Sequence, residues 1–118
     1  MAAVIMVTDD LIFASRVAGA SEAGGLECRT VKSERALRDA LAGQDVRLVI
    51  VDLGLDPAVL DACTAVLAEL AGPARIAYYP HVRVDLRKRA TSLGIDEVMP
   101  RSKFAQELCS IIGRCGGR

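Results

Sequence analysis

Three aspartates that directly follow short apolar runs are the residues of this sequence best suited to carry chemistry. Asp9 and Asp10 come after the first run, and Asp52 ends the third. Carboxylates brought close together repel one another unless a cation neutralises them. Hard oxygen ligands suit Mg²⁺, which binds one or two carboxylates and keeps several of its waters. We therefore expect Asp9, Asp10 and Asp52 to form a Mg²⁺ site.

The last two apolar runs lead into a different set of side chains, which we expect at the same pocket. Tyr79, Pro80 and His81 follow the fourth run, and Arg101 and Lys103 follow the fifth. His81 has no nucleophile at a spacing that would make it a general base. We therefore interpret these five residues as pocket positions and expect no enzyme.

Five apolar runs alternate with amphipathic stretches, and capping or turn residues mark most of the changes. We expect strands at residues 3–7, 26–31, 47–52, 74–79 and 95–99, and helices at 11–23, 34–41, 57–71, 82–93 and from 103 onward. Strand and helix following one another five times predict a parallel sheet covered by helices on both faces. We expect an α/β fold, a flavodoxin-like (βα)5 three-layer sandwich with strand order 2-1-3-4-5.

In such a sheet the carboxyl ends of the strands meet at one edge, and ligands bind there. The first turn at this edge, Thr8–Leu11, is acidic and has no glycine, unlike the phosphate-binding turns of dinucleotide and flavin sites. The alignment of this turn stays open. Thr8 could take the first acidic position and Asp9 the second, which would leave Asp10 to cap the helix.

Three motifs at matching positions resemble response-regulator receiver domains of the CheY-like type. V-T-D-D at 7–10 is similar to the acidic end of that family's first strand, and I-V-D-L at 50–53 to its phospho-acceptor strand. G-I-D-E-V-M at 94–99 is similar to the segment that enters its fifth strand. The resemblance covers nearly the whole chain in length, element order and motif position.

The resemblance implies that Asp52 accepts a phosphoryl group from a histidine kinase, in a two-component phosphorelay. It implies a Mg²⁺ held by Asp9, Asp10, Asp52 and the backbone carbonyl of Gly54.

The remaining positions of the family pattern depart from its usual residues. The strand-four hydroxyl position falls on Tyr79 and is followed by Pro80, and the strand-five lysine position falls on Arg101. Lys103 stands two residues beyond that position. Because a phenol and a guanidinium differ in reach and shape from a small hydroxyl and an ammonium, we expect an atypical receiver.

Length and charge set further limits. The 118 residues favour a single domain over 1–118, and fifteen basic residues balance fifteen acidic ones. Zero net charge gives no reason to expect direct binding of nucleic acid. No apolar run reaches about 18 residues, so we expect no membrane span and a cytoplasmic location. We expect the four cysteines to be reduced thiols, with Cys109 in the core.

We expect the chain to be a stand-alone receiver domain that acts by protein–protein contact. Its partner would be a histidine kinase or an output protein, or a second copy bound through the face formed by the fourth helix, fifth strand and fifth helix, residues 82–113. The alternative is a domain of the same fold that is not phosphorylated. That domain would bind a small molecule or metal in the acidic pocket, or serve as an adaptor.

Overall fold

The described part of the computed structural model covers residues 2–43, 45–79 and 95–115. Its elements are β1 (Ala2–Val7), α1 (Leu11–Ala23), β2 (Glu27–Val31), α2 (Glu34–Ala42), β3 (Asp45–Asp52), α3 (Pro57–Ala68), β4 (Ala74–Tyr79), β5 (Glu97–Pro100) and α5 (Arg101–Cys115). The helix expected at 82–93 lies outside the described residues, as do Pro80 and His81.

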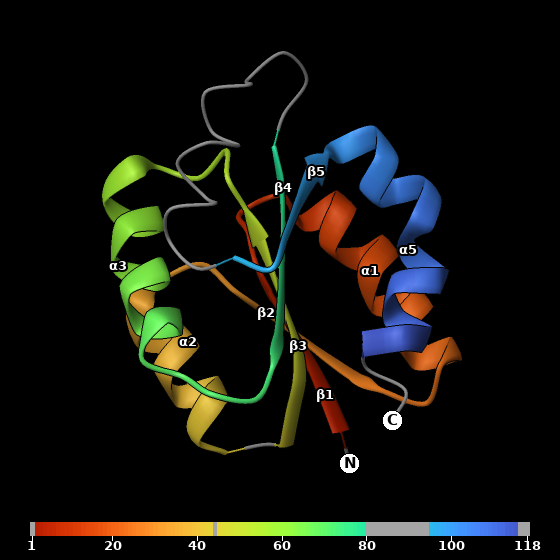
Figure 1. Cartoon of the computed structure of the whole chain (residues 1–118), viewed down its shortest axis with the longest axis horizontal. Helices are drawn as coiled ribbons and strands as arrows, with labels where there is room; N and C mark the ends of the chain where they lie inside the picture. The colour runs from red at the N-terminus through yellow and green to blue at the C-terminus, as the bar shows by residue number, and fades with distance from the viewer. Residues whose placement is uncertain (1, 44, 80–94, 116–118) are drawn as a thin grey trace.

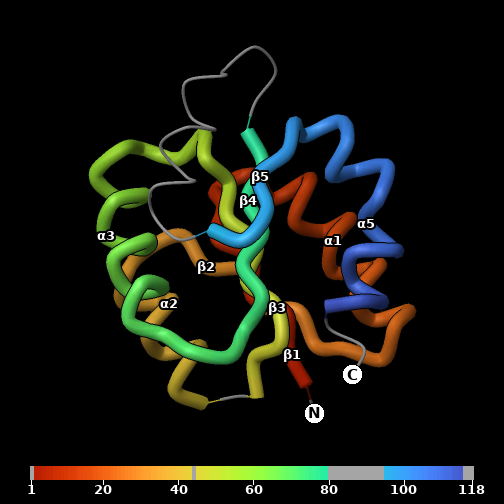
Figure 2. The backbone as a smooth tube through the Cα atoms, viewed as in Figure 1, coloured from red at the N-terminus to blue at the C-terminus, as the bar shows by residue number. Residues whose placement is uncertain are grey.

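The five strands form one parallel sheet in the order β2-β1-β3-β4-β5, which confirms the predicted flavodoxin-like topology. α2 and α3 cover one face of this sheet, and α1 and α5 lie side by side on the other (Figure 1). The backbone tube shows the same three layers, with the carboxyl ends of the central strands all at one edge (Figure 2). The residues that the sequence predicts to form the pocket follow the strands at that edge.

Capping residues set the starts of three helices. Asp10 accepts a hydrogen bond from the Phe13 N–H at the start of α1, and Ser33 does the same for Ala36 in α2. α3 begins with Pro57, after Asp56 as its cap. At α5 the prediction is wrong by two residues, because the helix starts directly at Arg101 and includes Ser102.

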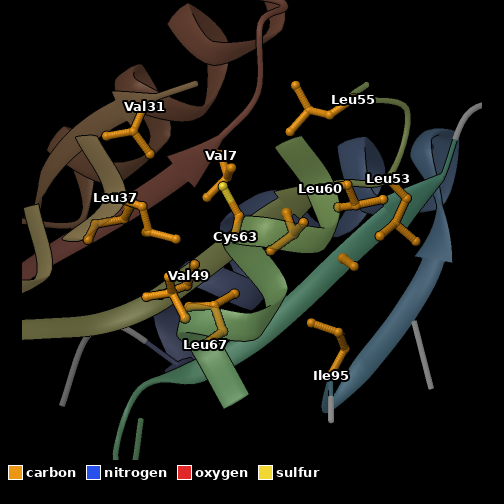
Figure 3. Packing of buried hydrophobic residues seen from close by; sticks show 14 of the residues in the cluster. Val7, Val31, Leu37, Val49, Leu53, Leu55, Leu60, Cys63, Leu67 and Ile95 are labelled. Atoms are coloured by element: carbon orange, nitrogen blue, oxygen red, sulfur yellow. The ribbon is translucent and has the colours of Figure 1, made fainter. Parts of the chain in front are cut away.

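The strands bury apolar side chains on both faces of the sheet, which gives two core clusters. One lies under α2 and α3 and includes Val7, Val49 and Cys63 (Figure 3). The other lies under α1 and α5 and includes Met6 and Ile50. Because both faces are filled, the central strands show no polar and apolar alternation.

The cysteines of the described residues are free thiols. Cys63 is buried, but Cys109, predicted to lie in the core, is exposed. The buried stripe of α5 runs through Phe104, Leu108 and Ile111, and a residue one position after Leu108 turns about 100° away from it. Among the described helices, none is long and apolar enough to cross a membrane.

Candidate functional site

Strand register places three polar side chains in one row at the carboxyl edge of the sheet. Val7 pairs with Val51, and Asp52 pairs with Tyr78. Met6 and Ile50 lie side by side in the cluster under α1 and α5. Side chains two residues apart on a strand point to the same face, so this face also carries Thr8, Asp52 and Tyr78. All three are buried, with only 0%, 8% and 2% of their surfaces exposed.

Asp52 is held by hydrogen bonds from the chain itself. The Thr8 hydroxyl donates to Asp52 Oδ2 at 2.7 Å, and the Gly54 backbone N–H donates to Oδ1 at 2.8 Å. Thr8 Oγ1 in turn accepts the Asp10 N–H at 3.0 Å. Hydrogen bonds to a charged group are about twice as strong as neutral ones, so the carboxylate is fixed in place at the end of β3.

Tyr78 is the tyrosine that lies beside Asp52. Its ring stacks on Phe104, with centroids 5.2 Å apart, and meets the edge of Phe13 at 5.3 Å. Its hydroxyl is buried and makes no hydrogen bond of normal geometry to any described residue. The hydroxyl is nevertheless close enough to Thr8 and Asp52 for both to affect its ionisation. Burial, and then the charge of Asp52, raise the pKa of Tyr78 well above its ordinary value.

The prediction that Tyr79 faces this pocket is wrong. Tyr79 packs in the opposite cluster, under α2 and α3, together with Val51 and Ile95. Successive residues of a strand point to opposite faces, so an error of one residue moves the side chain through the sheet. The sequence pattern could not reveal the error, because β4 is buried on both faces.

Asp10 does not join Asp52 but turns to α5. One of its oxygens caps α1, and the other accepts a hydrogen bond from Arg101 Nη2 at 2.7 Å. The Arg101 guanidinium also lies over the Phe13 ring, 4.4 Å from its centroid. The Phe13 N–H first, and the Arg101 guanidinium second, hold the pKa of Asp10 below its ordinary value.

The predicted Mg²⁺ set is not assembled. Asp9 is exposed, and Asp10 is paired with Arg101. Within the ranges that the structure describes, no three His, Cys, Asp or Glu side chains could hold a metal. The arrangement is the alternative one, in which Thr8 stands nearest Asp52 and Asp10 caps the helix.

Lys103, also expected at the pocket, points elsewhere. Its ammonium lies 4.0 Å from Glu107, one turn further along α5, and its side chain is 58% exposed. Arg101 is thus the basic residue of this pair that reaches the carboxyl edge.

The Asp10–Arg101 pair predicts a specific pH dependence of stability. Asn also caps helices, so Asp10→Asn removes mainly the charge pairing. The pKa of Asp10 is lower in the folded state than its ordinary value of 3.8. The stability that the charged Asp10 contributes is therefore present at neutral pH, and it is lost as the pH falls from about 3.8 through the lowered folded-state pKa. We expect the free energy of unfolding of wild type to exceed that of Asp10→Asn by about 0.5 kcal/mol at pH 7, since the pair is partly exposed. The two should converge once the pH lies below the lowered pKa of Asp10. Urea unfolding across pH checks this.

The control for that experiment is Asp39→Asn, an exposed aspartate on α2. A difference between wild type and Asp10→Asn that stays constant from pH 7 to pH 3 would exclude the ion pair as its cause.

Comparison with solved structures identifies the architecture that carries this site. A sensor protein from Polaromonas sp. JS666 superposes with a TM-score of 0.76 at 16% identity, covering 96% of this chain and 94% of that one. A response regulator receiver protein from Burkholderia phymatum gives 0.74 at 20% identity, covering 96% of each chain. This chain has the receiver-domain fold. The receiver domain of NtrX from Brucella abortus is similar at 0.72 and 22% identity, over 95% of this chain and 96% of that one.

No protein-family model and no curated protein matches the sequence. The likeness to receiver domains is therefore a likeness of fold. On that edge the receiver-like frame presents Asp52 among two hydroxyls and one backbone N–H.

Proposed function

We propose that the chain is an atypical receiver-type signalling domain, with Asp52 as the residue through which a signal enters. The observation that supports this most directly is the position of Asp52. It ends the central strand β3, at the edge where ligands of this fold bind, and keeps 8% of its surface exposed. Its carboxylate is fixed by Thr8 and Gly54, which orients an oxygen as a nucleophile.

The chemistry proposed is transfer of a phosphoryl group to Asp52. A carboxylate oxygen of Asp52 attacks the phosphorus of a donor, and the bond from phosphorus to the donor's leaving atom breaks. That atom, an imidazole nitrogen of a phosphohistidine or a carboxylate oxygen of a small acyl phosphate, departs with the electron pair, and an acyl phosphate remains on the protein. Arg101 brings positive charge near this edge, where its guanidinium pairs with Asp10 and lies over the Phe13 ring.

We propose that the output is a protein contact rather than a catalysed reaction. The first turn of α1 carries the exposed large apolar side chains of the described surface, Leu11 at 69% and Ile12 at 87%. They directly follow Asp10, so they lie next to the candidate site. An apolar pair beside a charged pocket suits a protein partner, such as a kinase or an output protein. A homodimer through residues 82–113 remains a proposal, since the structure describes only its β5 and α5 part.

The test is covalent labelling with a small acyl phosphate. We expect intact-mass spectrometry to show slow addition of one phosphoryl group to wild type, and none to Asp52→Asn. The matched control is Asp56→Asn, which removes an exposed aspartate four residues away while keeping a capping residue for α3.

Amide NMR spectra recorded with the same donor locate the modification. The expected shifts centre on Gly54, whose N–H donates to Asp52. Labelling that persists in Asp52→Asn, or wild type that stays unlabelled and silent in the spectrum, would overturn the proposed role of Asp52.

A further inference from the structure

The Asp52 carboxylate has more hydrogen-bonding capacity than its two clear partners use. An ionised carboxylate offers about four lone-pair sites. Thr8 and Gly54 occupy one site on each oxygen. The exposed Asp9 and the diverted Asp10 leave no acidic neighbour in the described region with which Asp52 could share a cation.

The Tyr78 hydroxyl is a donor that lacks an acceptor among the described residues. It is buried, and no described residue accepts its proton in normal hydrogen-bond geometry. A buried donor without an acceptor costs about 1–3 kcal/mol, and such groups are rare in folded proteins. Strand pairing sets Tyr78 directly beside Asp52, and both side chains lie on the face under α1 and α5. The carboxylate is therefore an acceptor within reach of a small side-chain adjustment.

The aromatic neighbours hold the phenol at this position. Phe104 stacks on one side of the Tyr78 ring, and Phe13 meets it edge-on. Arg101 covers Phe13 from above and is tied to Asp10, so the packing continues from β4 across α1 to α5. A ring confined in this way has few other places for its hydroxyl.

We propose that the Tyr78 hydroxyl is a third hydrogen-bond donor to Asp52 and covers the site. In this position the hydroxyl stabilises the negative charge of the carboxylate in place of a bound cation. The inference deepens the proposed function, because it names the element that restrains the input residue. Three donors stabilise the charge of Asp52 from within the chain. A cation or a phosphoryl donor then gains access only when the phenol moves aside.

The test compares Tyr78→Phe with Tyr79→Phe, using Mg²⁺ alone as the probe. Both variants lose one phenolic oxygen from neighbouring residues of β4, but the two rings lie on opposite faces of the sheet. We expect Mg²⁺, followed through the Gly54 amide, to bind about tenfold more tightly to Tyr78→Phe than to wild type, as for one lost hydrogen bond to a charged group. Tyr79→Phe should match wild type.

Urea unfolding of the same proteins gives a second readout. If the hydroxyl is bonded to Asp52, Tyr78→Phe unfolds at a lower urea concentration than wild type. A hydroxyl that stays unpaired gives the opposite result, because its removal relieves a buried polar group. A higher midpoint together with unchanged Mg²⁺ affinity in Tyr78→Phe overturns the inference, as does an equal response of Tyr79→Phe.

Labelling by the acyl phosphate separates this inference from the proposed function. Should neither wild type nor Tyr78→Phe be labelled while Mg²⁺ affinity rises in Tyr78→Phe, Asp52 is no phospho-acceptor but the closure by Tyr78 stands. Should wild type be labelled at Asp52 while Tyr78→Phe binds Mg²⁺ no better and is labelled no faster, the closure fails and the proposed function stands.

Discussion

Replacing Phe104 with alanine is expected to lower the free energy of unfolding by about 3–5 kcal/mol. Phe104 has 0% of its surface exposed, and its ring is stacked on Tyr78 and lies 5.9 Å from Phe13. The loss combines the transfer free energy of the ring with the cavity that remains. A domain of this size has about 5–15 kcal/mol of stability in total, so much of it would disappear.

Urea unfolding followed by far-UV circular dichroism measures this loss. The control is Gln106→Ala, an exposed position on the same helix that should change stability by less than about 0.5 kcal/mol. If the free energy of unfolding of Phe104→Ala lies within about 1 kcal/mol of the wild-type value, the aromatic cluster does not carry the packing of α5.

Replacing Thr8 with valine should have the second largest effect, a loss of about 1.5–3 kcal/mol. Valine keeps the β-branched shape but removes the hydroxyl, which donates to Asp52 and accepts from the Asp10 N–H. The buried carboxylate would then keep Gly54 as its remaining donor with normal geometry among the described residues. Leaving a buried charged group short of a partner costs more than the bond itself contributes.

Two further variants isolate the hydroxyl of Thr8. Thr30→Val makes the same substitution at an exposed position of β2 and should be nearly neutral. Thr8→Ser restores a hydroxyl and should recover most of the lost stability. The account fails if Thr8→Val and Thr30→Val prove equally stable by urea unfolding at pH 7.

Sequence patterns predicted the frame of the site well. Apolar runs separated by capping and glycine residues gave the strands within about two residues, and the order of elements led directly to the parallel sheet. Asp52 was placed at the end of its strand by the same run, because a nearly continuous apolar stretch is typical of a central strand. Asp10 as a helix cap was also within reach of sequence reasoning.

The assignment of side chains to the pocket was less successful. The resemblance puts the strand-four hydroxyl position on Tyr79, whereas the strand register brings Tyr78 to Asp52. Lys103 was expected near the pocket and instead pairs with Glu107. The expected approach of Asp9 and Asp10 to Asp52 failed because the chain turns after Thr8, which exposes one aspartate and draws the other to α5.

What the sequence by itself determined is the order of the strands and helices and the position of Asp52 at a strand end, since these follow from local periodicity and capping. Only the tertiary structure decided which neighbours Asp52 has. Thr8 and Asp52 are 44 residues apart, and Asp10 and Arg101 are 91 apart. Such contacts depend on strand register and on the face that each side chain takes, and a strand buried on both faces carries no alternation from which that face could be read.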